Sequence, residues 1–231
     1  MKQLHTTGIV LSRTDFGEAD RIITVLTPDA GKLRLMARGV RRVKSRMAGG
    51  IELFSVSDIT YILGRKEIGT LISTRLITHY GTIVQDIERV QLGYELIKIL
   101  HKATEDQTEP EYFELLQQAF IALDDKSIPT DLIHAWFQAQ LLKSAGHTPN
   151  LLTDTEGNEL AADQTYTFDP DAVAFQPRPE GSYTADHIKL LRLLFSSNAP
   201  TVLNKIEGIH SLLPDIKMLI NTQYRLHISH Q

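Results

Sequence analysis

The chain has 231 residues, a formal net charge of −4 and an apolar share of 42%, values that are ordinary for a folded protein of one or two domains. It contains no cysteine, which excludes disulfides, thiolate metal sites and cysteine nucleophiles and fits a reducing compartment. Its first residues hold too short an apolar run for a signal peptide, and no run approaches the roughly 18 apolar residues of a membrane span. We therefore expect a soluble, cytoplasmic protein without a membrane segment.

Charge is distributed unevenly along the chain. Residues 1–80 contain 13 Lys and Arg against 7 Asp and Glu, a net of +6, whereas residues 81–231 contain 11 against 21, a net of −10. An asymmetry of this size indicates two modules with different partners. We predict a first domain over residues 1–80 and a second over residues 81–231.

The first 80 residues have the pattern of short β-strands. Apolar, β-branched or alternating runs are separated by turn-forming segments such as Pro28–Gly31. The predicted strands are Thr6–Thr14, Arg21–Thr27, Lys32–Arg38, Leu53–Leu63 and Thr70–Ile77. Five short strands in so few residues are typical of a small barrel, and the expected architecture is an OB-fold.

The pattern then changes to helical spacing. Three helices are predicted, the first with Thr82 as its N-cap, the second beginning near Pro110, and the third capped by Thr130 and ended by Gly146. Helical spacing returns over Thr184–Asn198 and Ser211–Ser229.

Residues 147–183 interrupt the helical pattern. The part up to residue 164 is polar and is predicted to be a loop, and two short strands are predicted to form a hairpin around Asp169–Asp171. The predicted class is α+β: an N-terminal five-stranded OB-fold barrel followed by a mostly helical domain that carries this short hairpin insertion.

The sequence offers no recognisable catalytic site. Gly64–Thr70 has two glycines at the spacing of a phosphate loop but lacks its lysine, so we predict a turn there. The nine histidines are scattered, and the pair His227 and His230 at the end of the chain is not predicted to bind a metal. The adjacent Asp124 and Asp125 indicate a solvated turn at a helix end. We expect no enzyme activity, no cofactor and no metal.

A basic cluster stands out in this acidic chain. Gly31–Gly50 contains seven Lys or Arg and no acid. Alternation along the third strand places three of these residues on one face, and the other four continue into a loop that ends in glycine. A phosphate backbone suits such a patch, since binding releases condensed counterions. The predicted nucleic-acid contacts are Lys32, Arg34, Arg38, Arg41, Arg42, Lys44 and Arg46.

OB-fold proteins that bind single strands also stack bases on aromatic side chains. Phe16, Phe54 and Tyr61 are candidates for stacking, and each of them fits equally well in the barrel core. Few side chains here reach base edges, so little sequence specificity is expected.

The same segment carries a family resemblance. Residues Gly8–Ile59 resemble the N-terminal domain of RecO, the bacterial recombination mediator of DNA repair. The matching motifs, in order, are Glu18-Ala19-Asp20-Arg21, Thr27, Gly31-Lys32-Leu33, Ala37-Arg38-Gly39, Lys44-Ser45-Arg46 and Gly50. Tyr80–Leu100 and Phe137–Leu151 are similar to helices of the family's second domain.

The resemblance implies a DNA-binding mediator that is not an enzyme. It implies binding of single- and double-stranded DNA, annealing of complementary strands, contact with the C-terminal tail of single-strand binding protein (SSB), and loading of RecA with the help of RecR. It also implies a cytoplasmic, nucleoid-associated location.

The resemblance also bears on particular residues. Leu141, Leu142 and Lys143 are the candidates for the SSB-tail contact, although Trp136 stands where the family has a basic residue. Many members hold zinc with four cysteines in the region of 147–183, which lacks cysteine here. Asp20 and Arg21 are expected to form a structural ion pair.

The sequence also allows two other functions. A basic barrel also fits a sequence-nonspecific RNA-binding OB-fold protein, since stacking and phosphate contacts serve either polymer. An enzyme with its site in the 147–183 insertion is a third reading, but no nucleophile–base pair, metal cluster or phosphate loop favours it.

Overall fold

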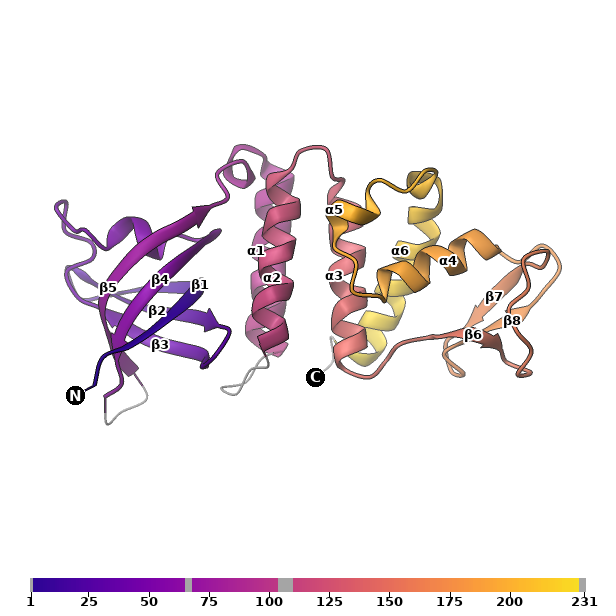
Figure 1. Cartoon of the computed structure of the whole chain (residues 1–231), viewed down its shortest axis with the longest axis horizontal. Coiled ribbons are helices and arrows are strands. Elements are labelled where there is room, and N and C mark those ends of the chain that lie inside the picture. The colour runs from indigo at the N-terminus through magenta and orange to yellow at the C-terminus, as the bar shows by residue number, and fades with distance from the viewer. Residues whose placement is uncertain (1, 65–67, 104–109, 229–231) are drawn as a thin grey trace. The chain divides into compact units, whose positions relative to one another are not determined.

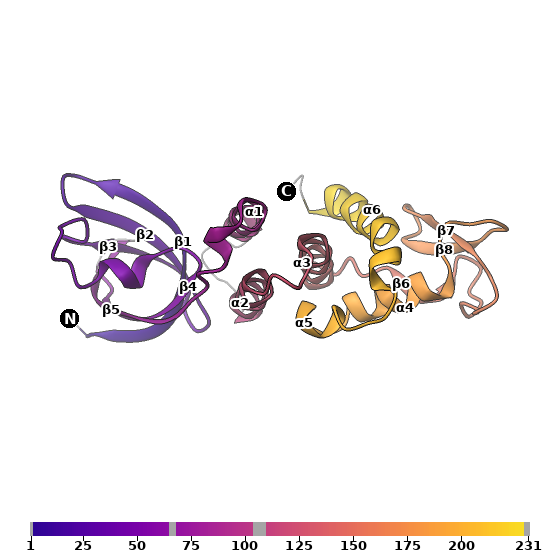
Figure 2. The same ribbon diagram turned by 90° about the horizontal axis from the view of Figure 1, so that it is seen from above.

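The chain divides into two compact units in a computed structural model that describes residues 2–64, 68–103 and 110–228. The first unit, Met1–Lys126, contains a β-barrel and two helices, and the second, Ser127–Gln231, contains helices and a small sheet (Figures 1 and 2). No helix among the described residues is both long and apolar enough to cross a membrane.

Five strands close into a barrel in the first unit. They are β1 (Leu4–Phe16), β2 (Asp20–Thr27), β3 (Gly31–Ala37), β4 (Ser55–Ile62) and β5 (Ile68–His79). The strands neighbour one another in the order β1-β2-β3-β5-β4, and β4 returns to β1. All pairs are antiparallel except β3 with β5. The predicted OB-type barrel is confirmed, and each predicted strand lies within a few residues of an observed one.

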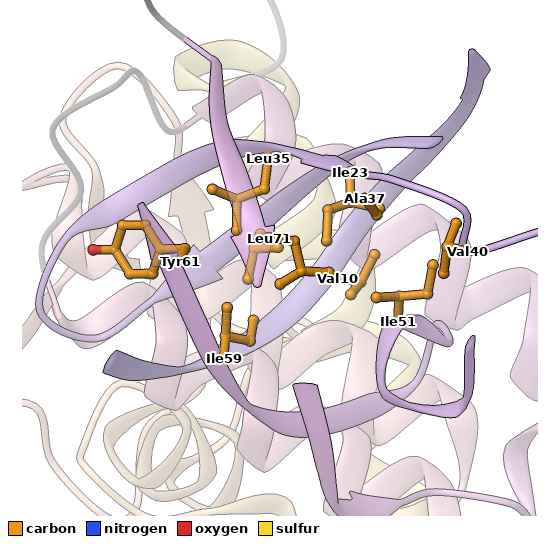
Figure 3. Close-up of a cluster of buried hydrophobic side chains, with 10 residues drawn as sticks. Val10, Ile23, Leu35, Ala37, Val40, Ile51, Ile59, Tyr61 and Leu71 are labelled. Carbon is orange, nitrogen blue, oxygen red and sulfur yellow. The ribbon is translucent and has the colours of Figure 1, made fainter. Parts of the chain in front are cut away.

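The barrel interior is filled by the apolar residues of the alternating pattern. Leu35 and Ile23 are fully buried, and Figure 3 shows them in one cluster with residues from the other strands. At one end of this cluster lie Val40 and Ile51, which come from the segment between β3 and β4. Ile51 belongs to η1 (Ala48–Ile51), a single 3₁₀ turn. Burying an apolar side chain of this kind contributes about 1.5–3 kcal/mol. The two buried residues Val40 and Ile51 therefore anchor this segment in the barrel core.

Two helices complete the first unit, α1 (Ile87–Ala103) and α2 (Pro110–Asp124), and they run side by side in both views. The prediction that Thr82 caps the first helix is wrong, since Thr82 precedes the short turn η2 (Ile83–Gln85). Asp86 caps α1 instead: its Oδ1 accepts hydrogen bonds from the backbone N–H groups of Glu88 (3.0 Å) and Arg89 (3.2 Å). The Pro110 start of the second helix is confirmed.

A buried arginine ties α1 to the end of α2. The guanidinium of Arg89 donates hydrogen bonds to the carbonyl oxygens of Leu123 (2.9 Å), Asp125 (3.0 Å) and Lys126 (3.1 Å). The last carbonyls of a helix lack partners within the helix, and a cation beside them also interacts favourably with the helix dipole. Asp124 is not a simple solvated turn residue, because its Oδ1 accepts a hydrogen bond from the N–H of Thr82 (2.7 Å).

The second unit is mainly helical. Its helices are α3 (Thr130–Ser144), α4 (Ala185–Leu194), the single turn α5 (Pro200–Leu203) and α6 (Ile209–His227). Helices α3 and α6 lie side by side (Figures 1 and 2). Thr130 is the first residue of α3 and Pro129 is its N-cap, whereas Gly146 ends the helix at a φ of 79° that favours glycine. Helix α5 was not predicted, and Ser229, the predicted end of the last helix, lies outside the described residues.

A three-stranded sheet interrupts these helices. Strands β7 (Tyr166–Asp169) and β8 (Ala174–Pro177) form the predicted antiparallel hairpin. The prediction of a loop before it is wrong in part, because β6 (Asn150–Asp154) pairs parallel with β8. This short edge strand has only two apolar residues, Leu151 and Leu152, so it lacks the longer apolar run that identifies a buried strand.

Candidate nucleic-acid interface

Residues 38–50, which follow β3 and lie in its connection to β4, carry most of the basic cluster, and we call them the basic loop. The loop is fastened to the turn between β1 and β2. Asp20 Oδ1 accepts a hydrogen bond from the N–H of Gly39 (2.7 Å), where the backbone has a φ of 64°, and the N–H of Arg41 donates to the carbonyl of Ala19 (2.9 Å). With Val40 buried between these two points, the loop has a defined path that leaves its charged side chains outside.

Arg41 helps to hold the basic loop against the turn between β1 and β2. Arg41 donates to the carbonyl of Gly17 (3.2 Å), and its guanidinium lies 3.4 Å from the carboxylate of Asp15. Arg21 also donates to Asp15 (2.8 Å), and this hydrogen bond, together with the charge of Arg41, holds the pKa of Asp15 below its usual value. The expected Asp20–Arg21 ion pair is therefore wrong: Arg21 pairs with Asp15, while Asp20 accepts from the loop backbone.

Lys32 at the start of β3 also makes a hydrogen bond within the first unit. Its Nζ donates to the carbonyl of His101 in the last turn of α1 (3.2 Å). Burial lowers the pKa of His101, and the nearby charge of Lys32 lowers it further. Among the seven predicted contacts, Lys32 thus contributes to the attachment of α1 as well as to the local positive potential.

The other five predicted contacts are exposed to solvent. Within the part of the chain that the structure describes, their side chains make no hydrogen bond or ion pair. They are Arg34, Arg38, Arg42, Lys44 and Arg46. Five cations without a neutralising carboxylate can bind an extended polyanion, because each phosphate contact releases a condensed counterion.

The three candidates for base stacking separate into two groups. Phe54 is 2% exposed and Tyr61 is 4% exposed, so both are core residues and not stacking platforms. Phe54 meets Phe120 of α2 edge to face, with ring centroids 5.4 Å apart, and Tyr80 also meets Phe120 at 5.7 Å. Phe16 at the end of β1 is 53% exposed. The sequence did not single out Val43, which is fully exposed in the middle of the basic loop.

Both halves of the chain match models of one known protein family. Residues 1–80 match the family model described as Recombination protein O N terminal, and residues 84–231 match the model described as Recombination protein O C terminal. The chain belongs to the RecO family. The predicted resemblance is thereby confirmed over almost the whole chain.

Curated relatives agree with the family models. The DNA repair protein RecO of Dehalococcoides mccartyi is 25% identical over 227 residues, which cover 95% of this chain and 88% of that protein. That of Roseiflexus sp. strain RS-1 is 30% identical over 167 residues, covering 72% of this chain and 58% of that protein. That of Synechococcus elongatus is 35% identical over 149 residues, covering 62% and 54%. Several relatives are thus matched over little more than half of their length.

The residues suggested by the RecO family for the SSB tail lie in α3. Leu141 is 3% exposed and Leu142 is fully buried, so these two side chains form part of the helical core, which argues against their lining an open pocket. Lys143 is exposed. Trp136 is buried as well, and its Nε1 donates to the carbonyl of Asn198 (2.8 Å). Helical spacing alone did not separate the buried leucines from accessible ones, because α3 is apolar around most of its circumference.

The region where many RecO-family members hold zinc has a different chemistry here. In residues 2–64, 68–103 and 110–228 no group of three or more His, Cys, Asp or Glu could hold a metal ion. Asp154, which is nearly buried, accepts backbone hydrogen bonds from Glu156 (2.8 Å) and Asn158 (2.9 Å), so its carboxylate closes a turn. The rings of Phe175 and Tyr183 meet edge to face (5.6 Å) beside the sheet. An apolar aromatic contact and a carboxylate-closed turn are an arrangement that does not fit a zinc site.

Proposed function

We propose that this RecO-family chain acts in DNA repair as a recombination mediator, binding single- and double-stranded DNA through its basic loop. The observation that supports this most is the set of five exposed cations on β3 and the basic loop, held on a segment that is anchored in the barrel core. Membership of the RecO family supports the choice of DNA repair as the process. We also infer a cytoplasmic, nucleoid-associated location.

Mechanistically, the basic loop contributes charge and position, and no covalent chemistry is needed. Phosphate contacts fix the strand against the barrel without reading its sequence. When two strands are held on the same positive surface, their mutual repulsion falls, and complementary strands then anneal more readily. Together with RecR, the bound protein would help RecA replace SSB on single strands.

The proposed protein partners follow from the family and from charge. The tail of SSB is acidic and ends in an apolar residue, so its site needs a cation beside an apolar surface. We propose that this site lies in the helical region, where Lys143 is an exposed cation.

Annealing and binding assays test the DNA proposal. The double substitution Arg41→Glu and Arg42→Glu should weaken binding of single-stranded and duplex DNA and slow annealing of complementary strands. RNA of the same sequence should be the poorer competitor for bound single-stranded DNA. If RNA competes better, the chain is the sequence-nonspecific RNA-binding protein of the alternative reading, and unchanged DNA binding in the variant would remove the basic loop from the interface.

A pull-down tests the SSB proposal. An SSB tail peptide should capture the full chain, and the same peptide without its last residues should not. The variant Lys143→Glu should reduce capture, with Lys189→Glu as a control because Lys189 is paired with Asp186 on α4. Equal capture by both peptides would exclude specific recognition of the tail.

A further inference from the structure

Two large apolar side chains are exposed on the basic loop and on the end of the strand that is fastened to it. Phe16 is 53% exposed at the end of β1, and Val43 is fully exposed between Arg42 and Lys44. Water-exposed apolar side chains are common singly, but here Val43 lies between Arg42 and Lys44, and Phe16 follows Asp15, with which Arg41 pairs. Within the first unit they come from segments that are fastened together.

The contacts of Arg41 place these two segments beside each other. Arg41 binds both neighbours of Phe16: its side chain donates to the carbonyl of Gly17 and faces the carboxylate of Asp15. Val43 follows Arg41 by two residues in the same short loop. The turn that follows Phe16 and the loop that carries Val43 are therefore held together.

The loop backbone keeps Val43 directed outward. The N–H of Arg42 donates to the carbonyl of Gly39 (3.1 Å), and the N–H of Ser45 donates to the carbonyl of Arg42 (2.9 Å). These two successive turns leave Val43 at the tip. Val40, by contrast, is buried in the barrel core three residues earlier. The same loop thus directs one valine inward and one outward.

The charge around these side chains limits what they can contact. Phe16 has two acidic neighbours, Asp15, which Arg21 and Arg41 pair, and Glu18. A ligand that contacts both apolar side chains therefore has to place its negative charge on the basic loop and a flat apolar surface against Phe16. Unpaired bases beside their phosphates have this combination, whereas in a duplex the base faces are covered by stacking. Stacking on an aromatic ring tolerates any sequence, since every base has a π-face.

We propose that Phe16 stacks on an unpaired base and that Val43 covers a neighbouring base face, which gives the basic loop a preference for single strands. This inference rests on the proposed DNA binding and adds the part that distinguishes single strands from duplex. The cations attract both single-stranded and duplex DNA. The two apolar side chains add binding energy only with single strands, whose base faces are accessible.

Abasic DNA separates the two contributions, because it keeps the phosphates and lacks the bases. The full chain and its Phe16→Ala variant are titrated with a single strand, an abasic strand of the same length and a duplex. Phe16→Ala should lose roughly fivefold to 150-fold in affinity for the normal strand, by the usual size of a stacking contact, and less than twofold for the other two ligands. Its salt dependence should be unchanged, since no charge is removed.

Further variants serve as controls. Phe16→Trp should retain the preference for the normal strand, since tryptophan also stacks, and Val43→Ala should lose a few-fold in the same direction. Leu152→Ala removes another exposed apolar side chain, from β6 of the second unit, and should change nothing. Circular dichroism checks that each variant is folded.

The outcomes are distinguishable. Equal affinity of the unmodified chain for normal and abasic strands, or an equal loss on all three ligands in Phe16→Ala, overturns the stacking inference and leaves the DNA proposal intact. Failure of the unmodified chain to bind any of the three ligands overturns the proposed function itself.

Discussion

Removing two cations from the tip of the basic loop should change the salt dependence of DNA binding by a definite amount. Arg42 and Lys44 are exposed, and within the described residues their side chains have no partner. Substituting both by alanine therefore removes phosphate contacts without breaking an internal bond. Each phosphate contact contributes about 0.7 to the slope of log K against log salt for a single strand, so the double variant should have a slope shallower by about 1.4.

The same relation gives the loss of affinity. A slope difference of about 1.4 per decade of salt corresponds to binding about 25-fold weaker at 0.1 M than the unmodified chain, with the difference vanishing near 1 M. For a duplex, about 0.9 per contact gives a loss of about 60-fold under the same conditions. Fluorescence anisotropy with a labelled oligonucleotide at five or six salt concentrations measures both quantities.

A control variant distinguishes loop contacts from general charge. Arg75→Ala with Lys189→Ala also removes two positive charges, but Arg75 is already paired with Asp58 and Lys189 with Asp186. This control should keep the slope of the unmodified chain. Parallel salt plots for the unmodified chain and the Arg42/Lys44 variant would refute the reasoning, as would an equal change of slope in the control.

Three further predictions concern the first unit. Leu35→Ala should lower the free energy of unfolding by about 2–5 kcal/mol, because Leu35 is fully buried in the barrel core, and the exposed Leu63→Ala should change it by less than about 0.5 kcal/mol; denaturant titration measures both. Arg89→Met should cost about 3–5 kcal/mol in the same assay, since one carbonyl in the last turn of α2 and two just after the helix lose a buried cation. Lys32→Met should raise the pKa of His101 in an NMR titration, because one of the two causes that lower it is removed.

The lowered pKa of His101 also makes the stability of the fold depend on pH. The folded pKa lies below the unfolded value of about 6.5, so the unfolded state binds the proton first as the pH falls. This contribution to stability is present above about pH 6.5 and is lost as the pH falls through the folded pKa. Lys32→Met should weaken this dependence. A pKa for His101 that stays constant in the variant would contradict the assigned role of Lys32, and equal losses in Leu35→Ala and Leu63→Ala would contradict the assigned core.

The barrel was predictable from the sequence because apolar and polar residues alternate along its strands, and because turn-forming residues such as those of Pro28–Gly31 separate the strands. Leu33, Leu35 and Ala37 against Lys32 and Arg34 give both the strand and its faces. The cap of α1 was misassigned because Thr82 and Asp86 are both good caps four residues apart, and the choice between them depends on the short turn η2.

The sequence predicted which cations belong to the candidate interface. It did not predict the hydrogen bonds and ion pairs that some of them make within the protein. Alternation shows that Lys32 shares a face with Arg34, but only the fold shows that Lys32 reaches the end of α1. The burial of Phe54 and Tyr61 likewise depends on Phe120 and on strand pairing, which join residues far apart in the sequence. Long-range packing of this kind leaves no signal in a local pattern.

The contact of Phe120 with both Phe54 and Tyr80 decides how the chain can be dissected. A fragment that ends at residue 80 would keep every strand of the barrel and lose the aromatic ring that closes one side of it, leaving two large aromatic side chains open to water. Exposed surfaces of this type promote self-association, so such a fragment should precipitate on expression. A fragment that ends at Lys126 retains α2, and it should be the shortest piece whose binding to DNA reports on the barrel itself.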